Sequence, residues 1–269
     1  MPEQVTHDGL TLVVERSQHD ATRAPVLLVH GIFVGAGSLA GAQRGLAARG
    51  RDAVAVHLRG RFGSRPVADI GRATFAEYVQ DVRDAAAFVA GTYGRAPILL
   101  GHSMGGLLVQ KALEGGVDAA AAVLVCSAPP RGILALTWAI ARRMAPYVPA
   151  MGAARAIAFA REDAFALALN ALPPERREAV YTRDFVRDSG HVLRELALGV
   201  PVDARRVTPP MLAITGSDDR FVPAATVRKI ATRYGATFRE YPGHGHVLLE
   251  EPGCDRIIGD IAAWLDGHA

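Results

Sequence analysis

The sequence has little cysteine and little lysine. Cys126 and Cys254 are its two cysteines. Two residues offer no disulfide framework and lack the spacing of a zinc site, so we expect each to be a small buried apolar residue. Lysine is limited to Lys111 and Lys229 among 30 basic residues, and the net charge is only +3. Because no basic stripe with interleaved aromatic residues occurs, we expect no nucleic-acid partner.

Long apolar runs are also missing. The most apolar stretch, residues 132–141, contains Thr137 and is bounded by Arg131 and Arg142. It is far shorter than the roughly 20 residues that span a bilayer. The N-terminus has neither a basic start nor an apolar run, and therefore shows no secretory signal. These absences predict a soluble, cytoplasmic protein without a membrane span.

Cofactor motifs are absent as well. The sequence contains no H-E-x-x-H, no P-loop and no glycine-rich dinucleotide fingerprint, so we expect neither a metal nor a nucleotide cofactor. Half of the 269 residues are hydrophobic and 21% are charged, which supplies a large core and argues against disorder. A small-molecule substrate is the expected partner, and nothing in the sequence indicates an oligomeric state.

Short apolar runs alternate with longer helical patterns, which is the order of an α/β fold with a mostly parallel sheet flanked by helices. Residues 10–15 are expected to add an antiparallel edge strand and residues 237–241 a last strand. Thr74 and Glu77 have capping-box spacing and predict the start of a helix. Five runs are apolar at nearly every position and suit strands buried on both faces: residues 26–29, 53–56, 98–100, 122–125 and 211–214.

Residues 129–206 interrupt this alternation. The pattern there predicts helices only, near residues 133–144, near residues 154–169 and after Pro173-Pro174, where proline suits a first helical turn. A strandless insertion of this kind is typical of a cap over the edge of a sheet. We therefore divide the chain into an α/β core of residues 1–128 and 207–269 and a helical cap of residues 129–206.

A serine between glycines follows the third of the five apolar runs. Residues 101–105 read G-H-S-M-G and open a helical pattern, the context required of a nucleophile elbow. Gly101 and Gly105 permit a tight strand-to-helix turn that exposes the Ser103 hydroxyl. The amide of Met104 lies at the helix N-terminus, where partial positive charge favours an oxyanion. A glycine-rich turn with an incidental serine is the alternative.

A second turn accompanies this elbow. His30-Gly31-Ile32 follows the first apolar run, at the topological position from which a partner loop supplies a second oxyanion amide. Ile32 is the candidate for that amide. The alternative is a plain turn between a strand and a helix.

A serine hydroxyl is a poor nucleophile until an imidazole accepts its proton, and the imidazole needs a carboxylate to orient it. Asp218 and Asp219 follow the apolar run at 211–214, and His244 and His246 follow the last predicted strand. The order Ser, Asp, His is the one expected for this type of elbow. The residues alone leave either aspartate and either histidine open.

At this point the chain resembles the α/β-hydrolase superfamily, in the large group with a serine nucleophile, an HG-type oxyanion loop and a helical cap. The resemblance covers almost the whole chain, with the motifs in family order. The family pattern of glycine, two residues, then aspartate implies Asp219 as the acid, with Asp218 the alternative. The family histidine follows a glycine and precedes an apolar pair and an acidic residue, which implies His246 rather than His244.

One loop departs from the family pattern. Many relatives have Asp-x-x-Gly-x-Gly-x-Ser after the second core strand, whereas residues 57–64 here read H-L-R-G-R-F-G-S. His57 and Arg61 could bind an acidic group of a substrate. Our preferred interpretation is that both are solvated loop residues.

The cap has more apolar side chains than short helices need for one face. We expect some of them to line an apolar pocket over Ser103, since ligand sites are concave and lie at the carboxyl ends of parallel strands. The alternative is that all of them pack the cap onto the core. The candidates are Ile133, Leu134, Leu136, Trp138, Ile140, Met144, Tyr147, Met151, Ile157, Phe159, Phe165, Leu167 and Leu169.

The leading hypothesis is a carboxylesterase-like serine hydrolase that cleaves an ester, or thioester, of a hydrophobic small molecule. Ser103 would form the acyl-enzyme, His246 would transfer the proton, Asp219 would orient His246, and the amides of Ile32 and Met104 would hold the oxyanion. In relatives the same residue types also serve C–C bond hydrolysis, acyl transfer, perhydrolysis and lyase chemistry. A small-molecule receptor with incidental turnover is a further alternative.

Overall fold

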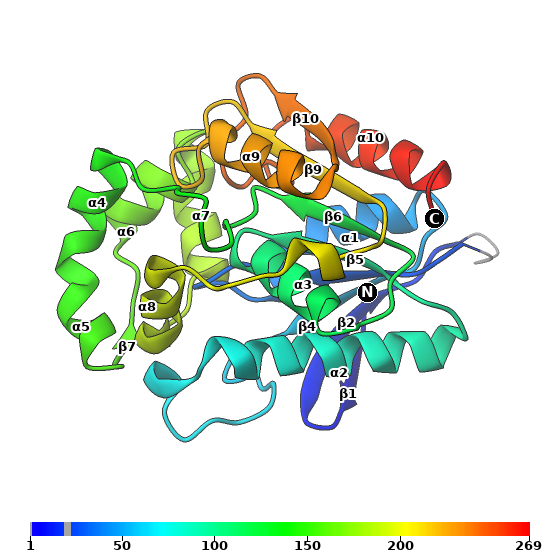
Figure 1. The fold of residues 1–269 in the computed structure, drawn as a ribbon, viewed down its shortest axis with the longest axis horizontal. Helices are drawn as coiled ribbons and strands as arrows, with labels where there is room; N and C mark the ends of the chain where they lie inside the picture. Colours follow the sequence, from blue (N-terminus) through cyan, green and yellow to red (C-terminus); the bar gives the residue numbers. More distant parts are fainter. Residues whose placement is uncertain (1, 19–22) are drawn as a thin grey trace.

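An eight-stranded sheet forms the centre of the structure, a computed structural model that describes residues 2–18 and 23–269 (Figure 1). The strand order is β1-β2-β4-β3-β5-β6-β9-β10. The pairs β1–β2 and β2–β4 are antiparallel and the other pairs are parallel, so the predicted mostly parallel sheet is confirmed. The strands are β1 (Glu3–His7), β2 (Leu10–Glu15), β3 (Val26–Val29), β4 (Ala53–His57), β5 (Ile98–His102), β6 (Ala121–Val125), β9 (Met211–Gly216) and β10 (Thr237–Tyr241).

The antiparallel edge differs from the prediction in one respect. Residues 10–15 do form a strand, but β1 pairs with its outer side and is itself the edge. Strand β1 is largely exposed, with Val5 as its one aliphatic residue. The expectation that β2 is the edge strand is therefore wrong. The sequence of β1 was not recognised as a strand, because its residues show too little alternation of apolar and polar side chains.

Helices cover both faces of the sheet. Val26 and Leu28 pack with residues of α1 (Ala40–Ala47) and α10 (Cys254–Asp266). Leu27 and Val29 point to the opposite face and pack with α2 (Phe75–Tyr93), α3 (Met104–Glu114) and α9 (Ala224–Tyr234). This division follows from the alternation of side chains along a strand. Short 3-10 turns occupy Ala36–Leu39, Ile70–Arg72, Ala145–Tyr147 and Ala204–Arg206.

The start of α2 is a capping box, as predicted. The Glu77 amide donates to Thr74 Oγ1 at 3.2 Å, and the Thr74 amide donates to Glu77 Oε2 at 2.8 Å. Two amides that lack helical acceptors are thereby satisfied.

Most elements of residues 129–206 gather beyond one end of the sheet, at the left of Figure 1. They are α4 (Trp138–Met144), α5 (Val148–Gly152), α6 (Arg161–Asp163), a π-helical turn (Ala164–Ala168), α7 (Pro174–Asp184) and α8 (Gly190–Leu198). The expectation of helices alone needs correction, because β7 (Ala156–Ile157) and β8 (Asp188–Ser189) form a short antiparallel pair. Strand β7 replaces the start of the helix expected near residues 154–169, and α8 was not predicted.

In the described ranges, no helix combines the length and the apolar character needed to cross a membrane.

Candidate active site

Ser103 lies in a sharp turn between β5 and α3. Its φ of 54° and ψ of −121° are unusual for a residue with a side chain and are maintained only when the surrounding structure enforces them. The two flanking glycines allow this turn: a Cβ on Gly101 would overlap the carbonyl oxygen of Gly105, and a Cβ on Gly105 would overlap that of Val29. Strand β3 and helix α3 therefore meet backbone to backbone beneath the serine.

The structure brings Ser103, His246 and Asp219 into one hydrogen-bonded row. His246 Nε2 lies 3.0 Å from Ser103 Oγ, and His246 Nδ1 lies 2.9 Å from Asp219 Oδ2. All three residues are buried. They follow the carboxyl ends of β5, β9 and β10, which lie at the same edge of the sheet. This arrangement lets a proton move from the hydroxyl to the imidazole while the carboxylate holds the ring.

Backbone amides fix the orientation of the Asp219 carboxylate. Its Oδ1 accepts hydrogen bonds from the amides of Phe221 and Val222, both at 2.8 Å. Oδ2 is left to face the His246 ring. The neighbouring Asp218 is exposed, and its carboxylate accepts instead from the Ser217 hydroxyl at 2.8 Å.

The loop that carries His246 is held on two sides. Glu251 accepts a hydrogen bond from the Gly245 amide at 2.9 Å and also contacts His244 Nδ1 at 3.0 Å. His244 therefore faces Glu251 rather than Ser103. On the other side, His102 Nε2 donates to the carbonyl oxygen of His246 at 2.8 Å. Burial and the nearby His246 lower the pKa of His102 to about 3, so His102 stays neutral and keeps this donor.

The predicted oxyanion residues, Ile32 and Met104, both line a cavity next to Ser103. His30 stabilises the turn before Ile32 through both nitrogens of its ring. His30 Nδ1 donates to the Gly31 carbonyl at 2.8 Å, and His30 Nε2 accepts from the Leu58 amide at 3.2 Å. Burial and Arg61 lower the pKa of His30 well below its usual value. A neutral imidazole with one donor and one acceptor satisfies both contacts.

A carboxylate from residues 129–206 holds the other side of this turn. Asp188 Oδ2 accepts from the Phe33 amide at 2.7 Å, and the Val186 amide donates to the Phe33 carbonyl at 2.7 Å. Asp188 also accepts from Tyr78 Oη at 2.7 Å and forms an ion pair with Arg61. Phe33 adopts a φ of 66°, which these contacts maintain. Sequence analysis did not identify Asp188, because nothing in its local sequence distinguishes it from a surface carboxylate.

His57 and Arg61 are not solvated loop residues, and that interpretation is wrong. Both are buried. Arg61 pairs with Asp188 and donates to Tyr78 Oη at 3.0 Å, while His57 Nδ1 accepts from the Ala36 amide at 3.2 Å. The loop folds inward because buried partners on other elements satisfy its charge.

Two cavities meet at Ser103, and both are lined by Ile32, Ser103 and Phe221. The larger has a volume of about 420 Å³ and the smaller about 40 Å³. Apolar residues of the segment 129–206 line the larger cavity: Ile133, Leu134, Leu136, Ile140, Met144 and Met151. Phe159 and Leu169 line the smaller one. Trp138 lines neither of them and is 82% exposed, so it was wrongly included among the pocket candidates.

Cys126 lies behind the hydrogen-bonded row. Its Sγ and the nearest ligand atoms of Asp219 and His246 lie within 4.8 Å of one another, a spacing that could hold a metal ion. Burial raises the pKa of the Cys126 thiol well above its usual value, whereas a metal requires the thiolate. Asp219 and His246 already contact each other. The cluster is therefore poorly suited to a metal, while Cys126 is fully buried as expected. Cys254 is only partly buried.

Comparison with known proteins gives a consistent result. The profile of the Alpha/beta hydrolase family matches residues 26–256. A monoacylglycerol lipase of Mycolicibacterium smegmatis is 27% identical over 259 residues, which cover 91% of this chain and 89% of that protein.

Solved structures share the fold at lower sequence identity. A monoacylglycerol lipase of Paleococcus ferrophilus superposes with a TM-score of 0.73 at 21% identity, covering 97% of this chain and 99% of that one. A thermophilic esterase from Thermogutta terrifontis gives a TM-score of 0.74 at 20% identity and full coverage of both chains. With the family profile matching most of its length, the chain belongs to the α/β-hydrolase family.

Proposed function

We propose that this protein is a serine hydrolase that cleaves an ester of a hydrophobic small molecule. Ser103 would be the nucleophile, His246 the general base and Asp219 the residue that orients His246. The observation that carries the proposal is the uninterrupted row of contacts, 3.0 Å from Oγ to Nε2 and 2.9 Å from Nδ1 to Oδ2. Both distances are those at which a base accepts a proton from a nucleophile and is itself oriented by a carboxylate.

The reaction then has two halves. Ser103 Oγ attacks the ester carbonyl carbon while its proton passes to His246 Nε2, and the tetrahedral oxyanion is held by the amides of Ile32 and Met104. The C–O bond to the alcohol breaks as His246 returns the proton to the leaving oxygen. Water enters, gives a proton to His246 and attacks the acyl-enzyme, which releases the acid and restores Ser103.

The two cavities suggest how an ester lies across the serine. The larger cavity is mostly apolar and fits the acyl chain, since burying a hydrocarbon chain there removes it from water. We infer that residues 129–206 form a separate cap over the core, because they supply most of that lining. The similarity to monoacylglycerol lipases supports an acyl ester of a small alcohol as the substrate.

Labelling with a fluorophosphonate probe tests the nucleophile, and a panel of nitrophenyl esters and thioesters tests the reaction. We expect labelling and ester turnover in the native protein, and neither in Ser103→Ala. Labelling without turnover of any ester would favour the other chemistries of this family or a receptor. A folded native protein that is not labelled would overturn the proposal.

A further inference from the structure

Glu251 is a buried carboxylate beside the loop that carries His246. It is only 2% exposed, and burial makes a carboxylate costly unless hydrogen-bond donors satisfy it. The Gly245 amide donates to both of its oxygens, at 3.1 and 2.9 Å, and His244 Nδ1 lies 3.0 Å from Oε2. Within the described ranges, His244 is its only ion-pair partner. The donors that satisfy Glu251 therefore belong to the two residues that precede His246 in the chain.

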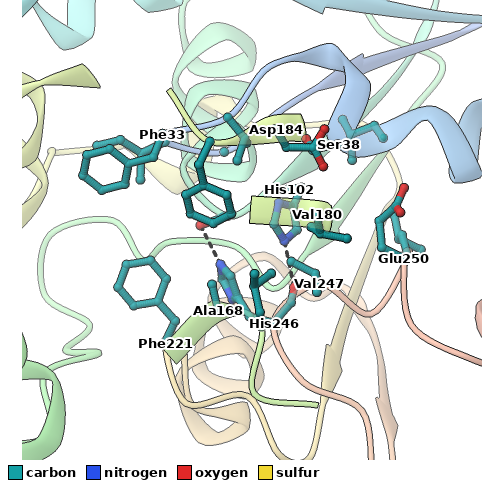
Figure 2. A pocket seen from close by; sticks show the side chains of 18 of the residues that line it. Phe33, Ser38, His102, Ala168, Val180, Asp184, Phe221, His246, Val247 and Glu250 are labelled. Atoms are coloured by element: carbon teal, nitrogen blue, oxygen red, sulfur yellow. Dashed lines mark hydrogen bonds between the residues drawn. The ribbon is translucent and has the colours of Figure 1, made fainter. Parts of the chain in front are cut away.

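The loop itself has no regular structure to hold it. Residues 242–253 lie between β10 and α10 and belong to no strand or helix, so single contacts fix the backbone of His246. On one side, His102 Nε2 donates to the His246 carbonyl, a contact that Figure 2 marks with a dashed line. On the other side, the Gly245 amide donates to Glu251. Because a buried amide without an acceptor is unfavourable, loss of the carboxylate would release this side of the loop.

The fit around Gly245 is close. An added Cβ would lie 2.9 Å from Ala171 Cβ and 3.2 Å from Glu251 Oε1. The peptide is therefore held between Ala171 and the carboxylate, and the small size of glycine lets the amide approach it. A change in the position of the carboxylate would move the backbone next to His246.

His246 depends on this loop for its distance from two partners. Its ring must lie 3.0 Å from Ser103 Oγ and 2.9 Å from Asp219 Oδ2 at the same time. The Asp218 amide donates to the His244 carbonyl at 2.8 Å, which joins the loop to the turn that carries Asp219. A displacement of about 1 Å at a reacting group can cost on the order of 10²-fold in rate. The arrangement therefore leaves little tolerance for movement of His246.

We propose that Glu251 is a positioning residue of the proposed reaction, whose carboxylate holds the Gly245 amide and so keeps His246 Nε2 within reach of Ser103 Oγ. This inference rests on the proposed function. Glu251 acts through the backbone, since it is not among the described residues that line either cavity. His244, which is 19% exposed, holds the carboxylate from the solvent side.

Three substitutions at Glu251 separate the hydrogen bond from the charge. Glu251→Ala leaves the Gly245 amide without its acceptor, and kcat for nitrophenyl butyrate should fall on the order of 10²-fold with little change in KM. Glu251→Asp keeps the charge but is one methylene shorter, so kcat should fall in this variant too. Glu251→Gln loses the charge but retains an oxygen for the Gly245 amide and should recover most of the native kcat. The rate of fluorophosphonate labelling should follow kcat, because attack on the probe requires the same base.

His244 is tested in the same way. His244→Ala removes the donor to Glu251 Oε2 and should lower kcat several-fold, whereas His244→Asn offers an amide donor at a similar position and should restore it. Asp255→Asn is the matched control, because it removes an 81% exposed carboxylate four positions beyond Glu251. This control should leave kcat and labelling as in the native protein. The thermal midpoint of each variant is measured first, and the kinetics are recorded below it.

The outcomes are distinguishable. Native kcat in folded Glu251→Ala and Glu251→Asp would overturn the positioning role while leaving the ester hydrolase intact. A Glu251→Gln variant as impaired as Glu251→Ala would assign the effect to charge and would also overturn it. If Glu251→Ala does not fold, the comparison of Glu251→Asp with Glu251→Gln still decides between these results. If the native protein showed no Ser103-dependent turnover of any ester, the proposed function itself would fail.

Discussion

Asp188 Oδ2 accepts a hydrogen bond from the Phe33 amide at 2.7 Å, although the two residues are 155 positions apart. This contact joins the proposed cap, residues 129–206, to the turn that carries Ile32, the proposed oxyanion donor. Asp188→Asn and Asp188→Ala both leave Arg61 without its buried charge partner, at a cost of about 3–5 kcal/mol in stability. Only the alanine variant removes the acceptor of the Phe33 amide.

We therefore expect kcat to fall further in Asp188→Ala than in Asp188→Asn, on the order of 10²-fold, with a smaller change in KM. Urea unfolding and steady-state kinetics on both variants provide the comparison. Binding of a trifluoromethyl ketone, which mimics the tetrahedral intermediate, should weaken in parallel with kcat. Equal kcat values in the two variants would show that the contact is only structural.

The two histidines of the last loop should behave differently on mutation. His246→Ala should lower kcat by a factor similar to that of Ser103→Ala, on the order of 10⁶-fold, because the nucleophile and its base act as a unit and removing either one abolishes their joint effect. His244→Ala should have a much smaller effect, since His244 contacts Glu251. Kinetics on the three variants with one nitrophenyl ester tests this. An active His246→Ala enzyme would contradict the assignment.

The larger cavity should make kcat/KM depend on the length of the acyl chain. Each buried methylene adds about 0.8 kcal/mol, so a butyryl ester should exceed an acetyl ester about tenfold in kcat/KM. Leu196 lines this cavity, and Leu196→Trp should fill it and lower octanoyl relative to butyryl turnover. Trp138→Ala is the matched control, because Trp138 is exposed and lines neither cavity. A preference for acetyl that neither variant alters would mean that the apolar cap residues are only structural.

Stability should depend on pH through buried histidines. Burial and Arg61 lower the pKa of His57 from 6.5 to about 4. Between these values the unfolded chain binds more protons than the folded one, so the free energy of unfolding falls as the pH falls from about 6.5 towards 4. For this one group the loss is about 1.4 kcal/mol per pH unit.

Urea unfolding at pH 7, 6 and 5 measures that slope. His57→Gln should reduce it but not abolish it, since the pKa values of His30 and His102 are lowered too. His268→Gln, at an exposed position, should retain the native slope. A native protein equally stable at all three pH values would refute the prediction.

The core of the fold is predictable because its five central parallel strands are apolar at nearly every position, as strands buried on both faces are. The elbow at Ser103 is predictable because its glycines are needed for backbone contact. The structure of residues 129–206 is harder to predict. The local sequence around Ala156–Ile157 predicts a helix, yet these residues form a strand because Asp188–Ser189 lies beside them.

Buried charge is the other feature that the sequence conceals. From the sequence Arg61 is expected to be solvated, since arginines are usually exposed. Its partner Asp188 is 127 positions away along the chain. The same holds for Glu251, which supports the His246 loop through the Gly245 amide. Such contacts depend on which segments meet in space, and no local pattern marks them.

The contacts of the site also bear on how the chain folds. Ser103 meets His246 across 143 positions, and Phe33 meets Asp188 across 155. Contacts between such distant positions form slowly, because closing a long loop costs entropy before any contact compensates for it. Helices such as α2 need only local contacts and form earlier. After dilution from denaturant, recovered turnover should therefore lag behind recovered helical signal, which makes activity the stricter measure of a completely folded chain.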